Sequence, residues 1–406
     1  MEKFIKWSCF LASGCVVLLF VFALYIGTLL PDTFLVASGN EIAIAGMPFV
    51  HASAAVSTDA VASMEEGSSY NAELTIAGIV PVKTVRAQVV ERRAVQVCGV
   101  PFGIKMFANG AMVVGFSDIY TAQGYKNPAK TAGLQMGDVI LSVAGRETKT
   151  NEDVAAALQQ QGGAPAEVIF VRDGVERSVL LTAVKDSAAG TWRTGMWVRD
   201  SSAGIGTLTF VDNATGVFAG LGHSIHDVDT GMTITLLKGE IVPVEITGAV
   251  AGSAGSPGEL KGRFLTSVPA GDITANSETG VYGTVRTFWK GFEAEVAMAQ
   301  EVVIGSAEIV ATIEGQEPQH YAAVIEKIAL SADNPNRNMV VRVTDPRLLN
   351  ATGGIVQGMS GSPILQGGRL VGAVTHVLVN DPTRGYAIFA ENMVQSADAA
   401  ALRAAA

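Results

Sequence analysis

Short runs of Val, Ile and Thr, interrupted by glycine, fill the chain from about Thr191 to Met393. Such runs favour short strands over long helices, because β-branched side chains pack well on a pleated sheet and glycine supplies the tight turns. Few stretches in this region have the 3.6-residue period of an amphipathic helix. The pattern predicts a closed or sandwiched antiparallel architecture, which leaves few exposed strand edges.

The composition agrees with a folded, mainly β protein of more than one domain. The 406 residues exceed what one hydrophobic core usually supports, so two or three folded units are expected. Only 16% of the residues are charged, and 45 are glycine. The formal net charge of −10 argues against binding to a nucleic-acid backbone, because such binding requires clustered Lys and Arg.

The N-terminal region contains 24 consecutive residues without a charge, from Trp7 to Leu30. As a helix they would be about 36 Å long, enough for a hydrocarbon core of about 30 Å. Lys3 and Lys6 precede the run, so the positive-inside rule places the N-terminus in the cytoplasm. We therefore expect a retained transmembrane anchor at residues 1–31 and an extracytoplasmic bulk. A cleaved signal peptide is the alternative, although the run is longer than the apolar part of most signal peptides.

The residues that follow, 32–97, are predicted to be a spacer and a strand-rich linker. Small and polar residues dominate 31–70, whereas alternating apolar residues from about Leu74 to Val97 indicate strands. Exposed stretches of small residues are where chains are cut, so the spacer is also a candidate cleavage segment. Cys98 stands alone beyond the expected anchor, so no intramolecular disulfide is expected there.

The segment AGLQMGDVILSVAG, residues 132–145, precedes a helix signal that starts at about Asn151. The block formed by residues 98–187 resembles an α+β PDZ domain of the bacterial periplasmic-protease type. A PDZ groove adds an extended peptide as an extra strand and binds its terminal carboxylate with backbone amides. The resemblance places those amides near Phe102, Gly103 and Ile104. A PDZ fold that only packs against the next domain is the alternative.

The segment Gly-Met-Ser-Gly-Ser-Pro, residues 358–363, places Ser360 on a glycine-rich turn. A serine hydroxyl becomes a good nucleophile only when a neighbouring base removes its proton. Flanking glycines allow backbone conformations that other residues resist, and they let a substrate carbonyl approach the main chain. The amides of Gly358 and Ser360 are the predicted oxyanion donors. A simple polar turn between strands is the alternative interpretation.

Only five histidines are available to act as the base. His51 falls in the spacer, whereas His223 lies in the glycine-flanked, turn-rich segment Gly-His-Ser-Ile-His-Asp. Functional side chains are often carried by loops, so His223 is preferred over His226, His320 and His376.

An acid is also expected, because it would hold the imidazole in the correct tautomer and stabilise its cation. Asp345 precedes Ser360 by 15 positions, while Asp227 and Asp229 lie beside the histidine. Spacing does not choose among them, and Asp345 precedes a proline, a common arrangement in turns.

Three segments, residues 222–231, 354–364 and 370–383, together resemble the stage IV sporulation protein B peptidases. That family consists of membrane-anchored PDZ serine peptidases of endospore-forming bacteria. The resemblance implies a mainly β protein with an N-terminal transmembrane helix, a PDZ domain, and a chymotrypsin-like double β-barrel at residues 188–400.

The resemblance assigns roles by position. His223 is the base, Ser360 the nucleophile and Asp345 the acid, and Thr375 lies on the strand that pairs with substrate. It also implies activity between forespore and mother cell, on the chain itself and then on a membrane regulator. Cleavage of that regulator releases an intramembrane protease that matures a late sigma factor. The partners are therefore a protein substrate, a peptide C-terminus or the chain itself at the PDZ groove, and a membrane at residues 7–30.

Three other functions compete with this one. His223 and His226, with Asp227 and Asp229, offer metal ligands, but the glycines around them indicate a loop and no His-Glu-x-x-His motif occurs. A non-catalytic PDZ adaptor at the membrane is the second alternative. A quality-control protease is the third, although such enzymes place the protease before the PDZ domain. No metal or cofactor is expected.

Overall fold

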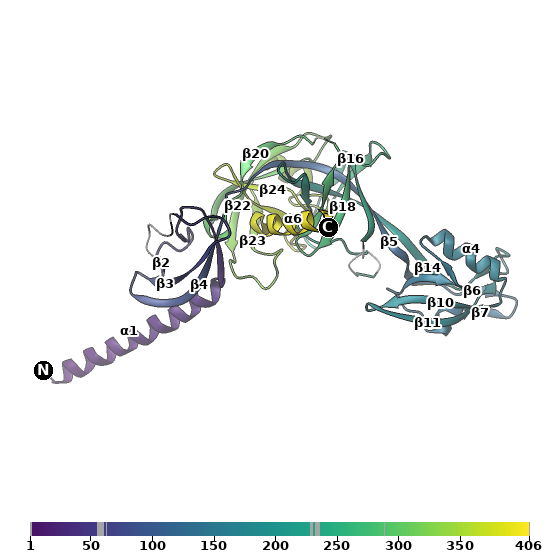
Figure 1. Ribbon diagram of the computed structural model, residues 1–406, viewed down its shortest axis with the longest axis horizontal. Coiled ribbons are helices and arrows are strands. Elements are labelled where there is room, and N and C mark those ends of the chain that lie inside the picture. Colours follow the sequence, from purple (N-terminus) through teal and green to yellow (C-terminus); the bar gives the residue numbers. More distant parts are fainter. Residues whose placement is uncertain are drawn as a thin grey trace.

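The computed structural model describes residues 2–54, 61, 63–227, 230–231, 236–287 and 289–405. The fold is mainly β, as predicted. Figure 1 shows three parts in a row: an N-terminal helix with a small sheet, a central β body, and a PDZ-like domain that projects from the body.

The N-terminal part is a four-stranded sheet with the helix against one end. It consists of α1 (Glu2–Leu29), β1 (Thr33–Ala37), β2 (Val50–Ala54), β3 (Ser69–Ile76) and β4 (Val80–Val90), in the sheet order β1-β4-β3-β2. Alternate residues of β3, namely Tyr70, Ala72 and Leu74, are buried in one core with residues of β1 and β4. Part of the segment expected to be a spacer therefore folds as strands.

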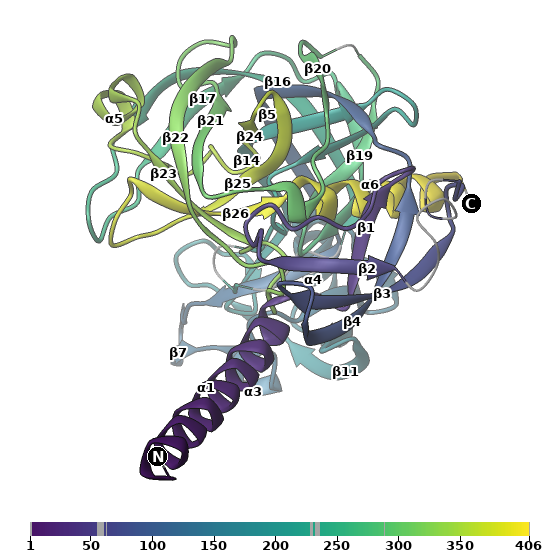
Figure 2. The same cartoon turned by 90° about the vertical axis from the view of Figure 1, so that its left-hand side faces the viewer.

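The prediction of a transmembrane anchor at residues 1–31, and with it the single-pass, extracytoplasmic localisation, is wrong. Among the described residues, no helix is long and apolar enough to cross a membrane. The uncharged run does form a helix, which extends away from the body in Figure 2. However, Ala23, Ile26 and Leu30 are buried, and Ile26 and Leu30 belong to the core of the first sheet. Lys83 Nζ also donates a hydrogen bond to Leu30 O at 2.8 Å. This end of the run therefore packs and bonds within the protein.

Two long strands join the body to the PDZ-like domain. β5 (Ala94–Phe116) and β14 (Met196–Asp212) pair antiparallel from Gln96 and Val211 in the body to Phe116 and Met196 beside the PDZ-like domain. They appear as a continuous ribbon in Figure 1. The body strands of the same sheet are β15 (Val217–Gly220), β16 (Leu236–Val250), β17 (Glu259–Phe264), β18 (Gly271–Ser277), β19 (Gly280–Val285) and β20 (Phe292–Glu295).

The PDZ-like domain forms around the far end of this ribbon. Its larger elements are β8 (Val139–Val143), α4 (Asn151–Gln161), β10 (Pro165–Arg172) and β11 (Val175–Thr182), and its shorter ones are β6 (Ile119–Thr121), β7 (Gly124–Lys126), α3 (Pro128–Ala132), β9 (Arg146–Glu147), β12 (Val184–Lys185) and β13 (Trp192–Arg193). Thr150 caps α4 in a capping box with Asp153, and Gly162 ends the helix in the left-handed conformation. The helix signal in the sequence was therefore correct, with the cap one residue before Asn151.

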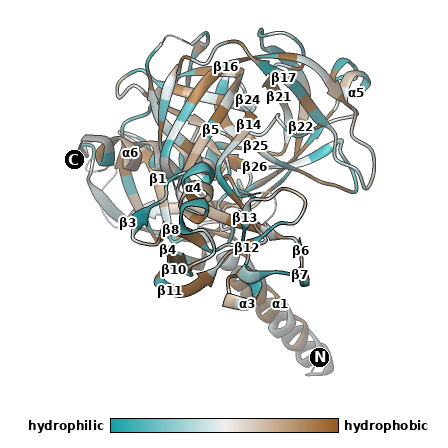
Figure 3. Ribbon diagram, turned by 90° about the vertical axis from the view of Figure 1, so that its right-hand side faces the viewer, coloured by the Kyte–Doolittle hydropathy of each residue, from teal (hydrophilic) through white to brown (hydrophobic). Residues whose placement is uncertain are grey.

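The second half of the body is a closed six-stranded barrel in the order β21-β22-β23-β26-β25-β24. Its elements are η1 (Ala299–Glu301), β21 (Gly305–Ala311), β22 (Gln319–Ile328), β23 (Met339–Val343), α5 (Pro346–Thr352), β24 (Pro363–Gln366), β25 (Arg369–Val377), β26 (Arg384–Phe389) and α6 (Ala390–Ala405). Alternate residues of β23, Met339, Val341 and Val343, face the barrel core. In Figure 3 the strands of the body accordingly carry both hydrophobic and hydrophilic residues.

The expectation of two separate barrels needs correction in one respect. The first half of the body does close on itself, because β16 pairs back with β5 in the ring β5-β14-β15-β19-β18-β16. This ring is not separate, however, because its strands belong to a twelve-stranded sheet shared with the PDZ-like domain. The reason is the length of β5, which pairs with β14 and β16 in the body and then continues to β8 in the PDZ-like domain. The first half of the body is consequently not an independent unit.

Truncation of two phenylalanines on β5 should have unequal effects on stability. Phe102 is fully buried beside Phe218, whereas Phe107 on the same strand is 37% exposed. We expect Phe102→Ala to cost roughly 3–5 kcal/mol of unfolding free energy, and Phe107→Ala roughly half of that or less. Urea unfolding of the two variants measures this difference. Equal costs would contradict the placement of Phe102 in the body core.

Candidate active site

Ser360 lies on a tight turn between α5 and β24 whose backbone only glycine accommodates easily. Gly358 and Gly361 have φ angles of +96° and +94°. A Cβ atom on Gly361 would lie 2.0 Å from Thr207 O, so a side chain there would displace the turn from the strand beneath it. The Gly-x-Ser-Gly pattern is therefore a geometric requirement at this position.

The turn is attached to both halves of the body. Thr207 of β14 donates its backbone N–H to Ser360 O and its hydroxyl to Gly358 O, both at 2.9 Å. On the other side, Gly361 N donates to Val374 O of β25 at 2.7 Å. These bonds fix the backbone of the Ser360 turn without using two of the turn's amides. Neither Gly358 N–H nor Ser360 N–H has an acceptor in the part of the chain that the structure describes, which is what an oxyanion hole requires.

His223 lies in the loop that follows β15, directly against β25. Gly222 has a φ of +71°, and a Cβ atom there would lie 2.9 Å from Thr375 Cγ2. His223 Nδ1 lies 2.8 Å from Ser224 O. A carbonyl oxygen only accepts hydrogen bonds, so Nδ1 carries the proton and Nε2 is left with the lone pair that a general base needs. Burial lowers the pKa of His223, and the bond to Ser224 partly opposes this effect.

Thr375 fixes the position of the Ser360 hydroxyl in this structure. Ser360 Oγ donates to Thr375 O at 2.7 Å, and the buried Thr375 hydroxyl donates to Asn336 O at 2.8 Å. Across the described residues, no hydrogen bond joins Ser360 to His223. The structure therefore shows a resting arrangement, from which Ser360 Oγ must rotate before it reaches the imidazole.

Ser360, His223 and Thr375 line one cleft of about 860 Å³ between the two halves of the body. Gly358 also lines it, so the predicted base, nucleophile and oxyanion donors meet although 137 positions of sequence separate His223 from Ser360. Most of the remaining wall is apolar and consists of Ile104, Ala203, Ile205, Leu221, Ile225, Pro257, Ile355, Val356, Val377 and Val379. No carboxylate in the described part of the chain lines this cleft.

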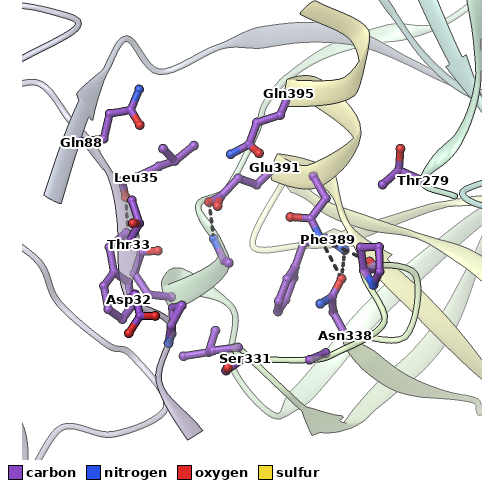
Figure 4. Close-up of a pocket in the computed structure, with 18 of the residues that line it drawn as sticks. Asp32, Thr33, Leu35, Gln88, Thr279, Ser331, Asn338, Phe389, Glu391 and Gln395 are labelled. Carbon is purple, nitrogen blue, oxygen red and sulfur yellow. Dashed lines mark hydrogen bonds between the residues drawn. The ribbon is translucent and has the colours of Figure 1, made fainter. Parts of the chain in front are cut away.

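A second pocket, of about 600 Å³, lies between β1, η1 and α6 (Figure 4). Glu391 points into it and accepts a hydrogen bond from Ala299 N at 2.9 Å. Burial raises the pKa of Glu391 to about 7. Serine and threonine hydroxyls line this pocket but no described histidine does, so it lacks the imidazole of a Ser-His pair.

Asp345 is not beside the imidazole. Its carboxylate accepts hydrogen bonds from Ala322 N and Arg347 N and forms an ion pair with the Arg347 guanidinium at 2.8 Å. These bonds, led by the one from the Arg347 side chain, hold the pKa of Asp345 well below its usual value. The aspartate is the N-cap of α5, so the structure gives the Asp-Pro pair the local role that the sequence also allowed.

The other acids do not complete a triad either. Asp227 accepts bonds from Thr230 N at 2.9 Å and from Arg199 Nη1 at 3.0 Å, and it does not line the cleft. Asp229 lies outside the described residues. His226 is exposed, and its Nε2 lies 3.5 Å from Ser224 Oγ.

Phe102, Gly103 and Ile104 lie in the body rather than beside the PDZ-like helix. This part of β5 pairs with β14 on one side and with β16 on the other. Phe102 and Ile104 are buried in the core between these strands. Their backbone groups already belong to two ladders, so they are not available to a peptide carboxylate.

His376 is the residue of the site that sequence reasoning ranked too low. Its ring stacks on that of His223, with 4.6 Å between the ring centroids and 33° between the planes. Burial, followed by the charges of His223 and Arg337, lowers the pKa of His376 to about 4. In the sequence, His376 directly follows Thr375, which could have indicated that it belongs to the site. In a regular strand, however, neighbouring side chains point to opposite faces, so His376 was not expected in the cleft.

Apart from residues 228–229 and 232–235 of the loop, which are not described, the region of His223 offers no metal site. No described group of three or more His, Cys, Asp or Glu side chains could hold a metal ion.

Comparison with known families agrees with this geometry. Residues 190–394, half of the chain, match the SpoIVB peptidase S55 family, and residues 122–172 match a PDZ domain. The chain belongs to the SpoIVB peptidase S55 family. It is a serine peptidase, a hydrolase of peptide bonds, with a PDZ domain, and its substrates are proteins.

Other comparisons add little to the S55 assignment. No curated protein is detectably similar to the chain. A similar solved structure is the PDZ domain of the SdrC-like protein from Listeria monocytogenes, which is 16% identical. The match covers 22% of this chain and 87% of the Listeria chain, with a TM-score of 0.19.

Replacement of Asp345 should affect stability more than catalysis. Asp345→Ala removes a helix cap and an ion pair, and we expect a loss of about 1–2 kcal/mol of unfolding free energy. We expect kcat/KM to fall less than tenfold, whereas loss of a triad acid costs about 10⁴-fold in kcat. Because the pKa of Asp345 is lowered, its contribution is present near neutral pH and disappears as the pH falls below about 4. Thermal unfolding and peptide hydrolysis by the same preparation test this. A loss of 10³-fold or more would make Asp345 the acid.

The pH profile should report the burial of His223, the predicted base. Because burial lowers the pKa of His223 below its ordinary value of about 6.5, the imidazole stays neutral in mildly acidic solution. We expect the midpoint of the acid limb of kcat/KM to lie below pH 6.5, where His223 becomes protonated. An acid limb centred above 6.5 would show that an anion stabilises the imidazolium.

Proposed function

We propose that this S55 peptidase is an endopeptidase in which Ser360 is the nucleophile, His223 the general base, and the amides of Gly358 and Ser360 the oxyanion hole. One observation carries the proposal: the glycine turn of Ser360 and the loop of His223 both pack against Thr375 in the same cleft. The free amides and the fixed tautomer of His223 supply the other two requirements of acyl transfer.

The reaction follows from these positions. Ser360 Oγ leaves Thr375 O and attacks the substrate carbonyl carbon while its proton passes to Nε2 of His223. The carbonyl oxygen becomes an anion and accepts hydrogen bonds from Gly358 N and Ser360 N. The C–N bond then breaks as His223 returns the proton to the leaving amine, and water hydrolyses the acyl-enzyme by the same steps in reverse order.

The imidazolium that forms has no carboxylate partner among the described side chains. Its Nδ1–H keeps the bond to Ser224 O, whose dipole stabilises the charge less than a carboxylate would. A base with a lowered pKa is also a weaker base. Both features favour a slow peptidase that cleaves few substrates, in keeping with regulated cleavage.

The wall of the cleft suggests the kind of side chain that the enzyme accepts. Ile205, Ile355 and Val377 contribute to its apolar lining, and no described acid is present to pair with Lys or Arg. We therefore expect an uncharged, apolar side chain next to the scissile bond. The PDZ domain adds a second site for an extended peptide, a free C-terminus or a segment of the chain itself.

The family resemblance supports a more specific role in sporulation. In this proposal the peptidase first cuts its own chain within residues 31–70 and then cuts a membrane regulator of an intramembrane protease, which matures a late sigma factor. A non-catalytic PDZ adaptor remains the competing function, and it would need neither Ser360 nor His223.

Two neighbouring serines provide a matched test. Ser360→Ala should lower the rate of peptide hydrolysis about 10⁴-fold or more, abolish labelling by a fluorophosphonate and leave the chain uncut. Ser362→Ala is the control, because the buried Ser362 Oγ has no hydrogen-bond partner among the described groups and does not line the cleft. Labelling and the new N-terminus are read by mass spectrometry. A Ser360→Ala chain that cleaves or labels like the parent would disprove the proposal, and an unchanged cellular phenotype would favour the adaptor.

A further inference from the structure

His376 is a polar residue of the cleft to which the proposed mechanism gives no role. Its Nδ1 atom is buried and has no hydrogen-bond partner among the described residues. An unpaired buried nitrogen costs free energy, so a histidine is an unfavourable choice if the position only fills space. An apolar residue would serve that purpose better.

A β-bulge brings His376 to the base. The pairing of β25 with β26 shifts register between Val374 and His376. In a regular strand neighbouring side chains point to opposite faces, whereas a bulge turns both toward one side. Thr375 and His376 accordingly both line the cleft. The same irregularity thus places the carbonyl that holds Ser360 and the ring that stacks on His223.

We propose that His376 is a positioning residue whose uncharged ring forms a platform for His223 and stabilises the imidazolium that forms during catalysis. This inference rests on the proposed roles of Ser360 and His223. A cation is attracted to the face of an aromatic ring within about 6 Å, and the two rings here are 4.6 Å apart. The platform thereby supplies part of the stabilisation that a carboxylate supplies in a complete triad.

The platform can act only while it is uncharged, and the surroundings of His376 keep it so. Two positive or potentially positive groups besides His223 disfavour its protonation, Arg337 from the loop before β23 and His226 from the loop of the base. Arg199 of β14 also lines the cleft and is paired with Asp227. No described carboxylate lines the cleft to offset these charges. Burial and these charges lower the pKa of His376 to about 4, so its ring is uncharged near neutral pH.

Two substitutions distinguish the contribution of the aromatic face of His376 from that of its ring nitrogens. His376→Phe keeps an aromatic face and removes the unpaired Nδ1, whereas His376→Leu removes the face. We expect the Phe variant to keep kcat/KM within about threefold, and the Leu variant to lose about tenfold, the size of a partly desolvated cation–π contact. We also expect the acid limb of the Leu variant to lie at lower pH, because the imidazolium of His223 has lost stabilisation.

NMR titration of His223, in chains that also carry Ser360→Ala, compares the pKa of His223 among the three chains without any turnover. The pKa of His223 should be lower with Leu at position 376 than with His or Phe. An equal pKa in all three chains, or a Phe variant as impaired as the Leu variant, would overturn the platform. Thermal unfolding of each variant identifies a chain that has merely lost its fold. The proposed function fails by a different result, namely retained hydrolysis in Ser360→Ala alone.

Discussion

The hydrogen bonds of Thr207 connect the two halves of the body at the proposed active site. Its backbone N–H and its hydroxyl bind the carbonyls of Ser360 and Gly358, and its own carbonyl accepts from Leu221 N at 3.3 Å. The nucleophile turn and the start of the histidine loop are therefore attached to one residue of β14. Gly361 makes this contact possible, because any side chain there would collide with Thr207 O.

Among the described residues, the proposed base His223 has no carboxylate beside it. In a complete triad a carboxylate sets the tautomer and stabilises the cation. Here the Ser224 carbonyl sets the tautomer, and burial lowers the basicity of His223. Asp345, the acid that the family resemblance favoured, is instead neutralised by Arg347 at the start of a helix. The resting hydroxyl of Ser360 bonds to a carbonyl rather than to the imidazole. These features lower the reactivity of the Ser360 and His223 pair.

The PDZ domain and the active-site cleft share a strand. β14 pairs with β5 along most of its length, and its residues 201–205 line the cleft while Met196 pairs beside the PDZ domain. The domain is thus an extension of the peptidase sheet and not a module joined by a flexible linker. This continuity also explains why Phe102, Gly103 and Ile104, which resemble a peptide-binding loop in sequence, are core residues of the body.

The sequence by itself determined what depends on local chemistry. Glycines at 358 and 361 predicted the nucleophile turn, Gly222 predicted the loop of the base, and alternating apolar residues predicted a mainly β fold, because each reflects the backbone geometry of a few neighbouring residues. The same reasoning failed at the N-terminus, where the uncharged run gave no sign that Ile26 and Leu30 belong to a protein core. The tertiary structure alone decided which side chains accompany His223. In the folded chain Asp345 is the N-cap of a helix and not a partner of His223. His376 lies against the imidazole, because strand pairing and one bulge in β25 set contacts between residues about 150 positions apart.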